Sequence, residues 1–457
     1  MNVPWSKRHK RDFAKKTWNL SNSFVHPLTH PELVQLTRDH NNDEESEALL
    51  AEYHNHSLEY TANGGSWDLR NDIATLYYGD SPEITADHIL VTAGGQVAIQ
   101  LAAQAFFANN NRKHSDTSSS SSPPHAIVFT PGYQSVVESP TWFGGSQTNS
   151  NDHDNANVTY IRRRARQNWQ VDVTAVRDAI RPHRTKYLVL NEPYNPAGTL
   201  MSRTVQHELI ALCHQHNIII VCDEVYRLLE HDEDGKTSRL PPMVQAYPER
   251  GVSIVAMSKP WGACGITIGW IACQNADMMD QLWDCHYFGT ACMSRASELQ
   301  ARMVLRVSDV IVQDRLAIIR HNKALLQTII ERDYPDLLEW QRPTAGAICF
   351  CKFKGPLTSL ELGSILSARG ISIKPAYCFM DDKQQQQTQT QTQKPNNNDN
   401  NNNDVVDDDD DDDDLASYFR IGYGERCIPQ ALEAFVAVLE EYKDEWRATM
   451  RQNQKKC

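Results

Sequence analysis

Short apolar runs that end in glycine or polar residues recur through the first 260 positions of the chain. Five of them read HILVTAGG (88–95), HAIVFTPG (125–132), KYLVLNEPYNPAG (186–198), NIIIVCDEVY (217–226) and VSIVAMSK (252–259). Their length and composition predict strands, and helical patterns such as QVAIQLAAQAFFA and RTVQHELIALCHQH lie between them. Strands that alternate with helices predict an α/β fold with a mostly parallel sheet sandwiched by helices.

The polar residues that follow these runs are candidates for a functional site, because the carboxyl ends of parallel strands share one edge of the sheet. In the first run, Thr92 to Gln96 form a glycine-rich turn that opens a helix. The backbone N–H groups around Gly94 and Gly95 are suited to holding a phosphate there. Taken alone, this turn and the Asn-Pro turn at Asn195 are equally typical of ordinary connections.

Two further strand ends carry a carboxylate and an amine in apolar surroundings. Asp223 follows IIIVC, where an unpaired charge would be costly, so a partner is expected. Lys259 follows VSIVAMS, and burial should lower its pKa and leave a nucleophilic amine suited to Schiff-base chemistry. The alternatives are a structural aspartate with satisfied hydrogen bonds and a lysine that extends to the surface.

One hypothesis gives all of these groups a role, namely a pyridoxal 5'-phosphate site. Lys259 would hold the cofactor as an aldimine, and Asp223 would keep its pyridine nitrogen protonated. Asn195 and Tyr226 would hydrogen-bond the phenolic oxygen. The glycine-rich turn, with Gly94, Gly95 and Gln96, would bind the phosphate.

The order of seven motifs resembles the class I and II aminotransferases, the fold-type I enzymes that use pyridoxal phosphate. The motifs are YTANGGSWDLR, TAGGQVA, PGY, NEPYNPAG, DEVY, SK…GW and FRIGYG, and the resemblance runs from about Asn19 to Trp446. It implies a seven-stranded type of sheet in a large cofactor domain and a smaller α+β C-terminal domain. It also implies that Tyr133 stacks on the cofactor ring, and that Arg420, with Asn195, binds the substrate α-carboxylate by its bidentate fork.

The same resemblance predicts the assembly and the division into domains. Tyr60, five residues before Gly65, resembles the tyrosine that reaches the cofactor phosphate of the neighbouring subunit. A homodimer with shared active sites is therefore implied, with amino acids and 2-oxo acids as substrates. Residues 1–55 are expected to pack on the small domain, 56–305 to form the large domain and 306–457 the small one.

Three polar segments interrupt this pattern. They are the Ser/Pro stretch 113–124, the Asn-rich stretch 145–157 and the Gln, Asn and Asp repeats of 383–414. Such compositions cannot offset the entropy of ordering, so we expect disordered loops. Nine of the negative charges behind the net charge of −13 fall at Asp404 and 407–414. The rest of the chain is only mildly acidic, and neither a nucleic-acid groove nor a membrane span is expected.

The eleven cysteines all lie at or after Cys213 and form no CxxC pair, so no metal site is expected. Scattered cysteines without a secretory leader indicate a reducing compartment such as the cytoplasm. The N-terminus MNVPWSKRHKRDFAKK is basic and has no apolar core for a signal peptide. Its charge leaves nuclear or organellar targeting open.

The chain departs from the family pattern at the cofactor phosphate. Ala256 stands where the family has the first serine before Lys259, and Thr267 stands where it has an arginine that pairs with the phosphate. Loss of a charge-assisted contact of this kind costs about 1.5–3 kcal/mol. Ser258, Thr267 and backbone N–H groups would then hold the phosphate, or another cation such as Arg295 would replace the missing one.

A second departure lies at NLSNSFVHPL, where Asn22 and Ser23 replace the glycine-proline pattern of the family's substrate-side segment. Three functions therefore remain open. The first is an aminotransferase in which Lys259 also moves the α-proton. The second is a lyase, cyclase or oxidase that acts on an amino acid on the same scaffold, and the third is a non-enzymatic relative.

Overall fold

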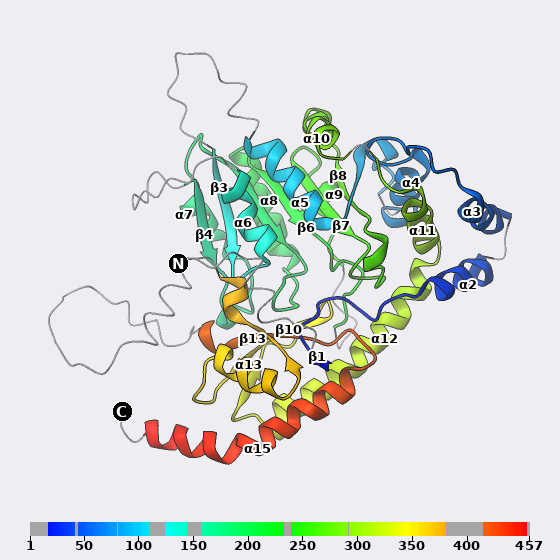
Figure 1. Ribbon diagram of the computed structural model, residues 1–457. Helices are drawn as coiled ribbons and strands as arrows, with labels where there is room; N and C mark the ends of the chain where they lie inside the picture. The colour runs from blue at the N-terminus through cyan, green and yellow to red at the C-terminus, as the bar shows by residue number, and fades with distance from the viewer. Residues whose placement is uncertain are drawn as a thin grey trace.

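The computed structural model describes residues 17–41, 44–79, 81–108, 124–143, 157–232, 239–290, 292–380 and 415–454 (Figure 1). The basic N-terminus and almost all of the three segments expected to be disordered lie outside the described residues. The expectations for those segments therefore stay predictions.

A central sheet of seven strands forms the core of the described part of the chain. Its strand order is β2 (Ile89–Thr92), β8 (Gly269–Cys273), β7 (Gly251–Ala256), β6 (Ile219–Asp223), β5 (Thr185–Asn191), β3 (His125–Thr130), β4 (Val158–Arg162). The pairs β4–β3, β3–β5, β5–β6 and β6–β7 are parallel, and β8 runs antiparallel to both of its neighbours. The structure thus confirms the predicted mostly parallel sheet.

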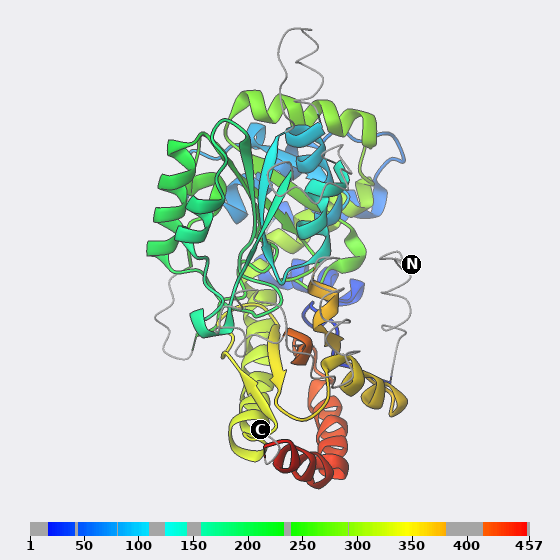
Figure 2. The ribbon, with the colours of Figure 1, turned by 90° about the vertical axis from the view of Figure 1, so that its left-hand side faces the viewer.

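Helices cover both faces of this sheet, as the alternating pattern predicted (Figure 2). On one face lie α5 (Gly95–Ala103), α6 (Gln134–Phe143) and α10 (Ala276–Gly289), and on the other lie α7 (Val173–Ala179), α8 (Arg203–Gln215) and α9 (Met243–Ala246). The strands are buried on both sides, so Val128 packs toward α5 while its neighbours Ile127 and Phe129 pack toward α8. This alternation explains why the strand runs are apolar throughout.

A further group of helices packs against the β2 edge of the sheet. It comprises α2 (His30–Asn41), α3 (Glu44–Asn55), α4 (Trp67–Asp72) and α11 (Arg295–Arg306). Leu33, Leu49, Leu69 and Leu299 from these helices share one apolar core with Trp270 of β8.

A smaller unit follows in the C-terminal part of the chain. Its antiparallel sheet has the order β12 (Lys374–Pro375), β13 (Tyr418–Gly422), β10 (Ile348–Phe353), β9 (Leu338–Trp340). The helices α12 (Ser308–Gln327), α13 (Ser359–Ala368) and α15 (Ile428–Gln454) belong to this unit. Figure 1 shows the arrowheads of β3 and β4 directed toward it, so the carboxyl edge of the central sheet faces the smaller unit.

The N-terminal segment joins these two parts. The strand β1 (Trp18–Asn19) pairs in parallel with β11 (Ile371–Ser372) of the smaller unit. The chain then crosses β13, where the Gly422 N–H donates to the Leu20 carbonyl at 2.7 Å. A Cβ at Gly422 would lie 1.6 Å from the Asn22 carbonyl oxygen, so only glycine permits this close approach. The N-terminal segment therefore lies against the carboxyl edge of the central sheet, where the polar strand ends meet. The expected domain boundaries at residues 55 and 305 stay predictions.

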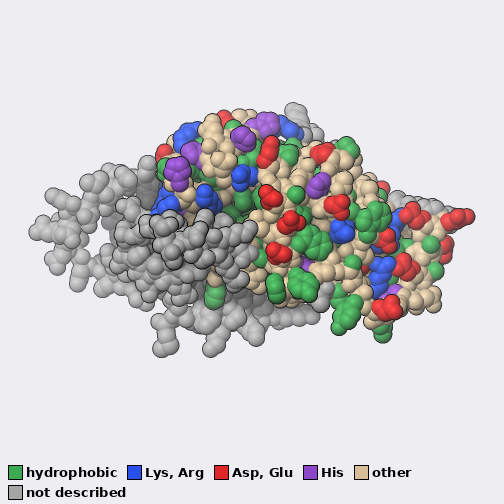
Figure 3. All heavy atoms as spheres, turned by 90° about the horizontal axis from the view of Figure 1, so that it is seen from above, with side chains coloured by type: hydrophobic (Ala, Val, Ile, Leu, Met, Phe, Trp, Pro, Cys, Tyr) green, Lys and Arg blue, Asp and Glu red, His purple; other side chains and the backbone are tan. Residues whose placement is uncertain are grey.

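The end of the molecule seen in Figure 3 mixes acidic, basic and hydrophobic side chains on its surface. Among the exposed large hydrophobic side chains of the described residues are Leu58, Tyr60, Trp142, Tyr287 and Phe288. Within the described residues, no helix combines the length and the apolar character that a membrane crossing requires.

Candidate functional site

The glycine-rich turn has the geometry of an anion cradle. Helix α5 begins at Gly95, and Gly94 before it has a φ of 85°, which favours glycine. A Cβ added at Gly94 would meet nothing within 4 Å, so the backbone is open on that side. The N–H groups of the first turn of α5 have no intrahelical acceptors and are available to a phosphate. The predicted helix start is confirmed, and phosphate binding there stays a prediction.

Gln96 links this turn to the predicted stacking residue. Its side-chain amide donates to the Tyr133 hydroxyl at 2.8 Å and to Ser135 Oγ at 3.3 Å. Tyr133 lies just before α6, so the contact joins the starts of two neighbouring helices. It fixes the position of the Tyr133 ring relative to the cradle.

Lys259 follows β7 and lies at the same edge. Its ammonium donates to Ser23 Oγ at 2.9 Å and lies 5.8 Å from the centre of the Tyr226 ring. Burial lowers the pKa of Lys259, with Arg420 acting in the same direction and Tyr133 opposing it. The predicted direction of this pKa shift is confirmed.

Asp223 is the last residue of β6 and its side chain is almost fully buried. Burial raises its pKa to about 7, while the Val225 N–H, which donates to the carboxylate at 3.3 Å, and the charge of Lys259 oppose the shift. A cation placed beside this carboxylate would favour its ionised form. The partners that the sequence led us to expect for the Asp223 carboxylate are thus the Val225 N–H group and the charge of Lys259.

Arg420 spans the two units. Strand β13 carries it, and its guanidinium donates to Asn195 Oδ1 at 2.9 Å and to the Ser21 carbonyl at 2.7 Å. Its Nε is buried without a hydrogen-bond partner in the described part of the chain. A buried guanidinium with an unused donor fits a carboxylate ligand. Tyr226, also buried, has a raised pKa because of burial, an effect that Arg420 and a hydrogen bond with Ser23 oppose.

Ser23 was noted in the sequence only as a departure from the family pattern. The structure places its hydroxyl between Lys259 and Tyr226, two residues that sequence reasoning had already selected. Nothing in the local sequence links residue 23 to residue 259, because the contact depends on the path of the N-terminal segment. The polar cluster SNS between the apolar residues Leu20 and Phe24 was the available signal.

The expected phosphate contacts from Ser258 and Thr267 remain predictions. Thr267 is exposed, with a φ of 58° and its hydroxyl 3.4 Å from the Gly265 carbonyl. The contacts of Arg295 do not support its suggested role as the cation that replaces the missing phosphate-binding arginine. Its guanidinium is ion-paired with Glu52 and Glu298. Tyr60 has 89% of its surface exposed in the single chain, which leaves it accessible to a second subunit.

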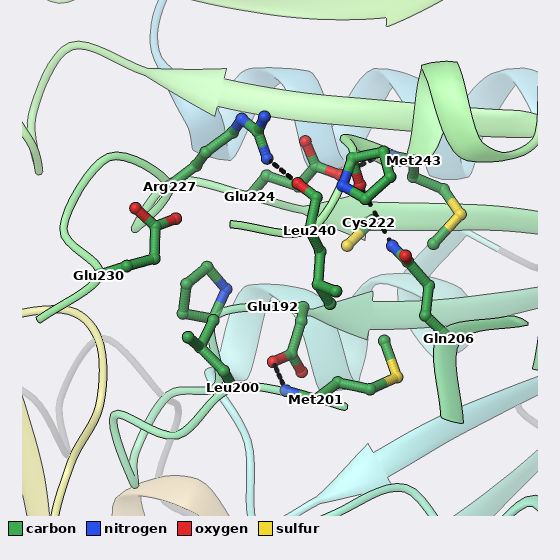
Figure 4. Close-up of a pocket in the computed structure, with 12 residues that line it drawn as sticks. Glu192, Leu200, Met201, Gln206, Cys222, Glu224, Arg227, Glu230, Leu240 and Met243 are labelled. Atoms are coloured by element: carbon green, nitrogen blue, oxygen red, sulfur yellow. Dashed lines mark hydrogen bonds between the residues drawn. The ribbon is translucent and has the colours of Figure 1, made fainter. Parts of the chain in front are cut away.

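A small cavity lies on the opposite face of the same strand ends (Figure 4). Side chains alternate along β6, so Asp223 faces α5 while Cys222 and Glu224 face this cavity. Burial raises the pKa of Glu224 to about 7, and one of its oxygens accepts the Met243 N–H at 2.6 Å. The cavity measures about 30 Å³, which is room for only a few water molecules. It cannot admit an amino acid and is not a substrate site.

Comparison with known proteins agrees with this geometry. Residues 29–380 match the family of class I and II aminotransferases. A probable aspartate aminotransferase of Methanocaldococcus jannaschii is 23% identical over 287 residues, 61% of this chain and 68% of that protein. A probable kynurenine–oxoglutarate transaminase of Saccharomyces cerevisiae is 23% identical over 265 residues, 55% of this chain and 52% of that relative.

Solved structures of low sequence identity share the fold. A pyridoxal phosphate-dependent aminotransferase of Streptococcus suis superposes with a TM-score of 0.74 at 22% identity, covering 97% of this chain and 99% of that one. The pyridoxal phosphate-dependent cyclase OrfR superposes with a TM-score of 0.71 at 19% identity, covering 96% and 98% of the two chains. The fold is therefore found in an aminotransferase and in a cyclase.

Proposed function

Because the chain belongs to the class I and II aminotransferases, a family of pyridoxal 5'-phosphate-dependent transaminases, we propose that it transfers an amino group from an L-amino acid to a 2-oxo acid with Lys259 at the reacting centre. The observation that carries the proposal is the meeting of Lys259, Asp223, Tyr226, Asn195 and Arg420 at one edge of the sheet. They come from four separate segments of the chain, since Asp223 and Tyr226 share the DEVY motif.

The residues at this edge fit the cofactor. The open backbone at Gly94 and the first turn of α5 would hold its phosphate, and Tyr133 would lie against its ring. Asp223 would face the ring nitrogen, where a positive charge would shift the carboxyl toward its ionised form. When bound, the cofactor supplies an electron sink that weakens the bonds at the substrate α-carbon.

Lys259 would move the proton at that carbon through its Nζ atom. An amine whose pKa is lowered by burial spends more time neutral and can accept a proton near physiological pH. Ser23 would hold Nζ in one orientation by the hydrogen bond at 2.9 Å. Arg420 would bind the α-carboxylate, and its contacts with Asn195 and Ser21 fix the plane of the guanidinium.

The alternative is a lyase, cyclase or oxidase that also begins by removing the α-proton. It is favoured by the fold shared with the cyclase OrfR and by the departures at Thr267 and Asn22–Ser23. Product analysis of the purified protein with added cofactor separates the two. A transaminase forms one equivalent of 2-oxo acid per site and then needs an amino acceptor, whereas continued ammonia release without an acceptor would support the alternative. The family match and the assembled site favour an enzyme over a non-enzymatic relative.

We expect Ser23→Ala to lower kcat about tenfold, because a hydrogen bond to a charged group contributes roughly 1.5 kcal/mol. The cofactor affinity, followed by absorbance titration, should change much less than kcat, since Ser23 does not contact the cradle that would hold the phosphate. Ser23→Thr keeps the hydroxyl and should restore most of the loss. Ser364→Ala, which removes an exposed hydroxyl on α13, is the control. An equal loss in the alanine and threonine variants would contradict a positioning role for Ser23.

We also propose a homodimer in which Tyr60 reaches the partner's site. The proposal is supported by the apolar side chains that the single chain exposes, among them Leu58 at 96% and Phe288 at 88%. Phe288→Asp would bury a charge in such an interface and should shift the protein toward monomers in sedimentation velocity. Leu360→Asp, at a half-exposed position on α13, should leave the mass unchanged. A Phe288→Asp variant that sediments like the wild type would place the interface elsewhere.

A further inference from the structure

Lys374 is a second buried lysine at the substrate side of the site. It begins the short strand β12 within the run SIKPAYCF (372–379), and 7% of its surface is exposed. In the antiparallel register of β12 and β13, Lys374 is the direct partner of Arg420. Cross-strand partners project to the same face of a sheet with their Cβ atoms roughly 5 Å apart. The two cations therefore start from adjacent positions on one face.

Aromatic rings tie both cations to the candidate site. The Lys374 ammonium lies 5.1 Å from the centre of the Phe379 ring, and the Arg420 guanidinium lies 5.2 Å from the centre of the same ring. The ammonium also lies 6.0 Å from the ring of Tyr133, the residue expected to stack on the cofactor. Lys374 thus shares the Phe379 ring with Arg420 and also lies near the ring of Tyr133.

Two cations at adjacent positions favour a ligand that carries two negative charges. Like charges directly opposite each other across two strands repel, and burial strengthens the repulsion. Burial, Arg420 and Lys259 together lower the pKa of Lys374 to about 7, with Cys378 opposing them. A bound carboxylate would reverse these effects and restore the protonated amine. Two cations at adjacent positions also disfavour substrates that carry a cationic side chain.

We propose that Lys374 binds the second carboxylate of a dicarboxylic substrate while Arg420 binds the first. The inference rests on the proposed transamination and specifies its substrate class, namely acidic amino acids and their 2-oxo diacids. Lys374 is then a specificity-determining residue. It does not take part in proton transfer.

The test compares Lys374→Met with wild type in the half-reaction of the cofactor-loaded enzyme. For aspartate and glutamate, kcat/KM should fall roughly 30-fold or more, the usual effect of removing one member of a buried charge pair. For alanine and 2-aminobutyrate it should change less than about threefold, because these substrates use Arg420 alone. Lys374→Arg keeps a charge and should retain the preference for diacids. Lys352→Met, on strand β10 of the same sheet, is the matched control.

An equal fall for both substrate groups would overturn the proposal and assign Lys374 to the α-carboxylate. Calorimetry with unreactive succinate and propionate distinguishes this failure from a failure of transamination itself. Succinate should bind wild type more tightly than propionate, and this difference should disappear in Lys374→Met even if no amino acid is converted. Wild type that binds succinate no better than propionate would refute the inference.

The pH dependence gives a reading that needs no variant, should Lys374→Met fail to fold. Lys374 must be protonated to bind the second carboxylate, so succinate binding should weaken as pH rises above about 7. Propionate binding should show no such step. A succinate affinity that stays constant through this range would also refute the inference.

Discussion

Replacement of Lys259 by alanine should lower kcat roughly 10⁴-fold or more, the scale of losing a group that acts both as nucleophile and as proton carrier. The Nζ atom ends a side chain that enters the site from the turn after β7, and Ser23 Oγ holds it at 2.9 Å. No hydroxyl of Ser23 or Tyr226 could replace it, because each stays protonated near neutral pH and a neutral hydroxyl is a poor proton acceptor.

The measurement is an absorbance spectrum of the protein with added pyridoxal phosphate, followed by a panel of amino acids without 2-oxo acid. Wild type should show a cofactor band that Lys259→Ala lacks, and the band should change on addition of a substrate. Lys443→Ala, which removes a surface amine paired with Glu440, should behave as wild type. A variant without Lys259 that kept both the band and the turnover would refute the assignment of the site.

The sheet was predictable because its strands are buried on both faces. Such strands are apolar along their whole length, so the runs ending at Asn191, Asp223 and Ala256 could be located without the structure. The parallel arrangement then placed their polar ends at one edge. The positions of Lys259 and Asp223 thus follow from local pattern and general topology.

The contacts between distant segments were not predictable in this way. Ser23 meets Lys259 across 236 positions of sequence, and Arg420 meets Asn195 across 225. The first contact depends on the pairing of β1 with β11, two strands of two residues each that leave almost no periodic signal. Lys374 did leave a signal, a lone amine in an apolar run like that of Lys259. Only the register of β12 with β13 places it beside Arg420.

Asp223 shows how a functional carboxylate affects stability. Its pKa is about 7 in the folded chain and 3.8 in the unfolded reference, so the folded protein binds this proton more tightly. The group therefore stabilises the fold at low pH relative to high pH, and this contribution is lost as pH rises from about 4 to about 7. At pH 8 the buried ionised form costs on the order of a few kcal/mol.

Asp223→Asn should consequently raise the free energy of unfolding of the cofactor-free protein at pH 8 and leave it nearly unchanged at pH 4. The amide keeps an oxygen that can accept the Val225 N–H, so the local hydrogen bond is retained. The same substitution should lower kcat by roughly 10²–10³-fold, because a neutral amide cannot stabilise a positive charge on the ring nitrogen. Denaturant unfolding at the two pH values and half-reaction rates measure the two effects.

The opposite signs of these two effects test the role of Asp223 more sharply than either effect alone. A buried carboxylate with a raised pKa costs stability at pH 8 whatever its role, so the mark of a carboxylate kept for the cofactor is a gain in stability on substitution together with a loss of half-reaction rate. Saturating cofactor should therefore stabilise wild type more than Asp223→Asn at pH 8. Glu224→Gln is the matched control, because Glu224 is also buried with a pKa raised to about 7 but faces the cavity on the other side of β6. It should gain stability at pH 8 as Asp223→Asn does, yet keep its half-reaction rate, and a comparable loss of rate in both variants would show that the effect of Asp223 is not specific to the cofactor.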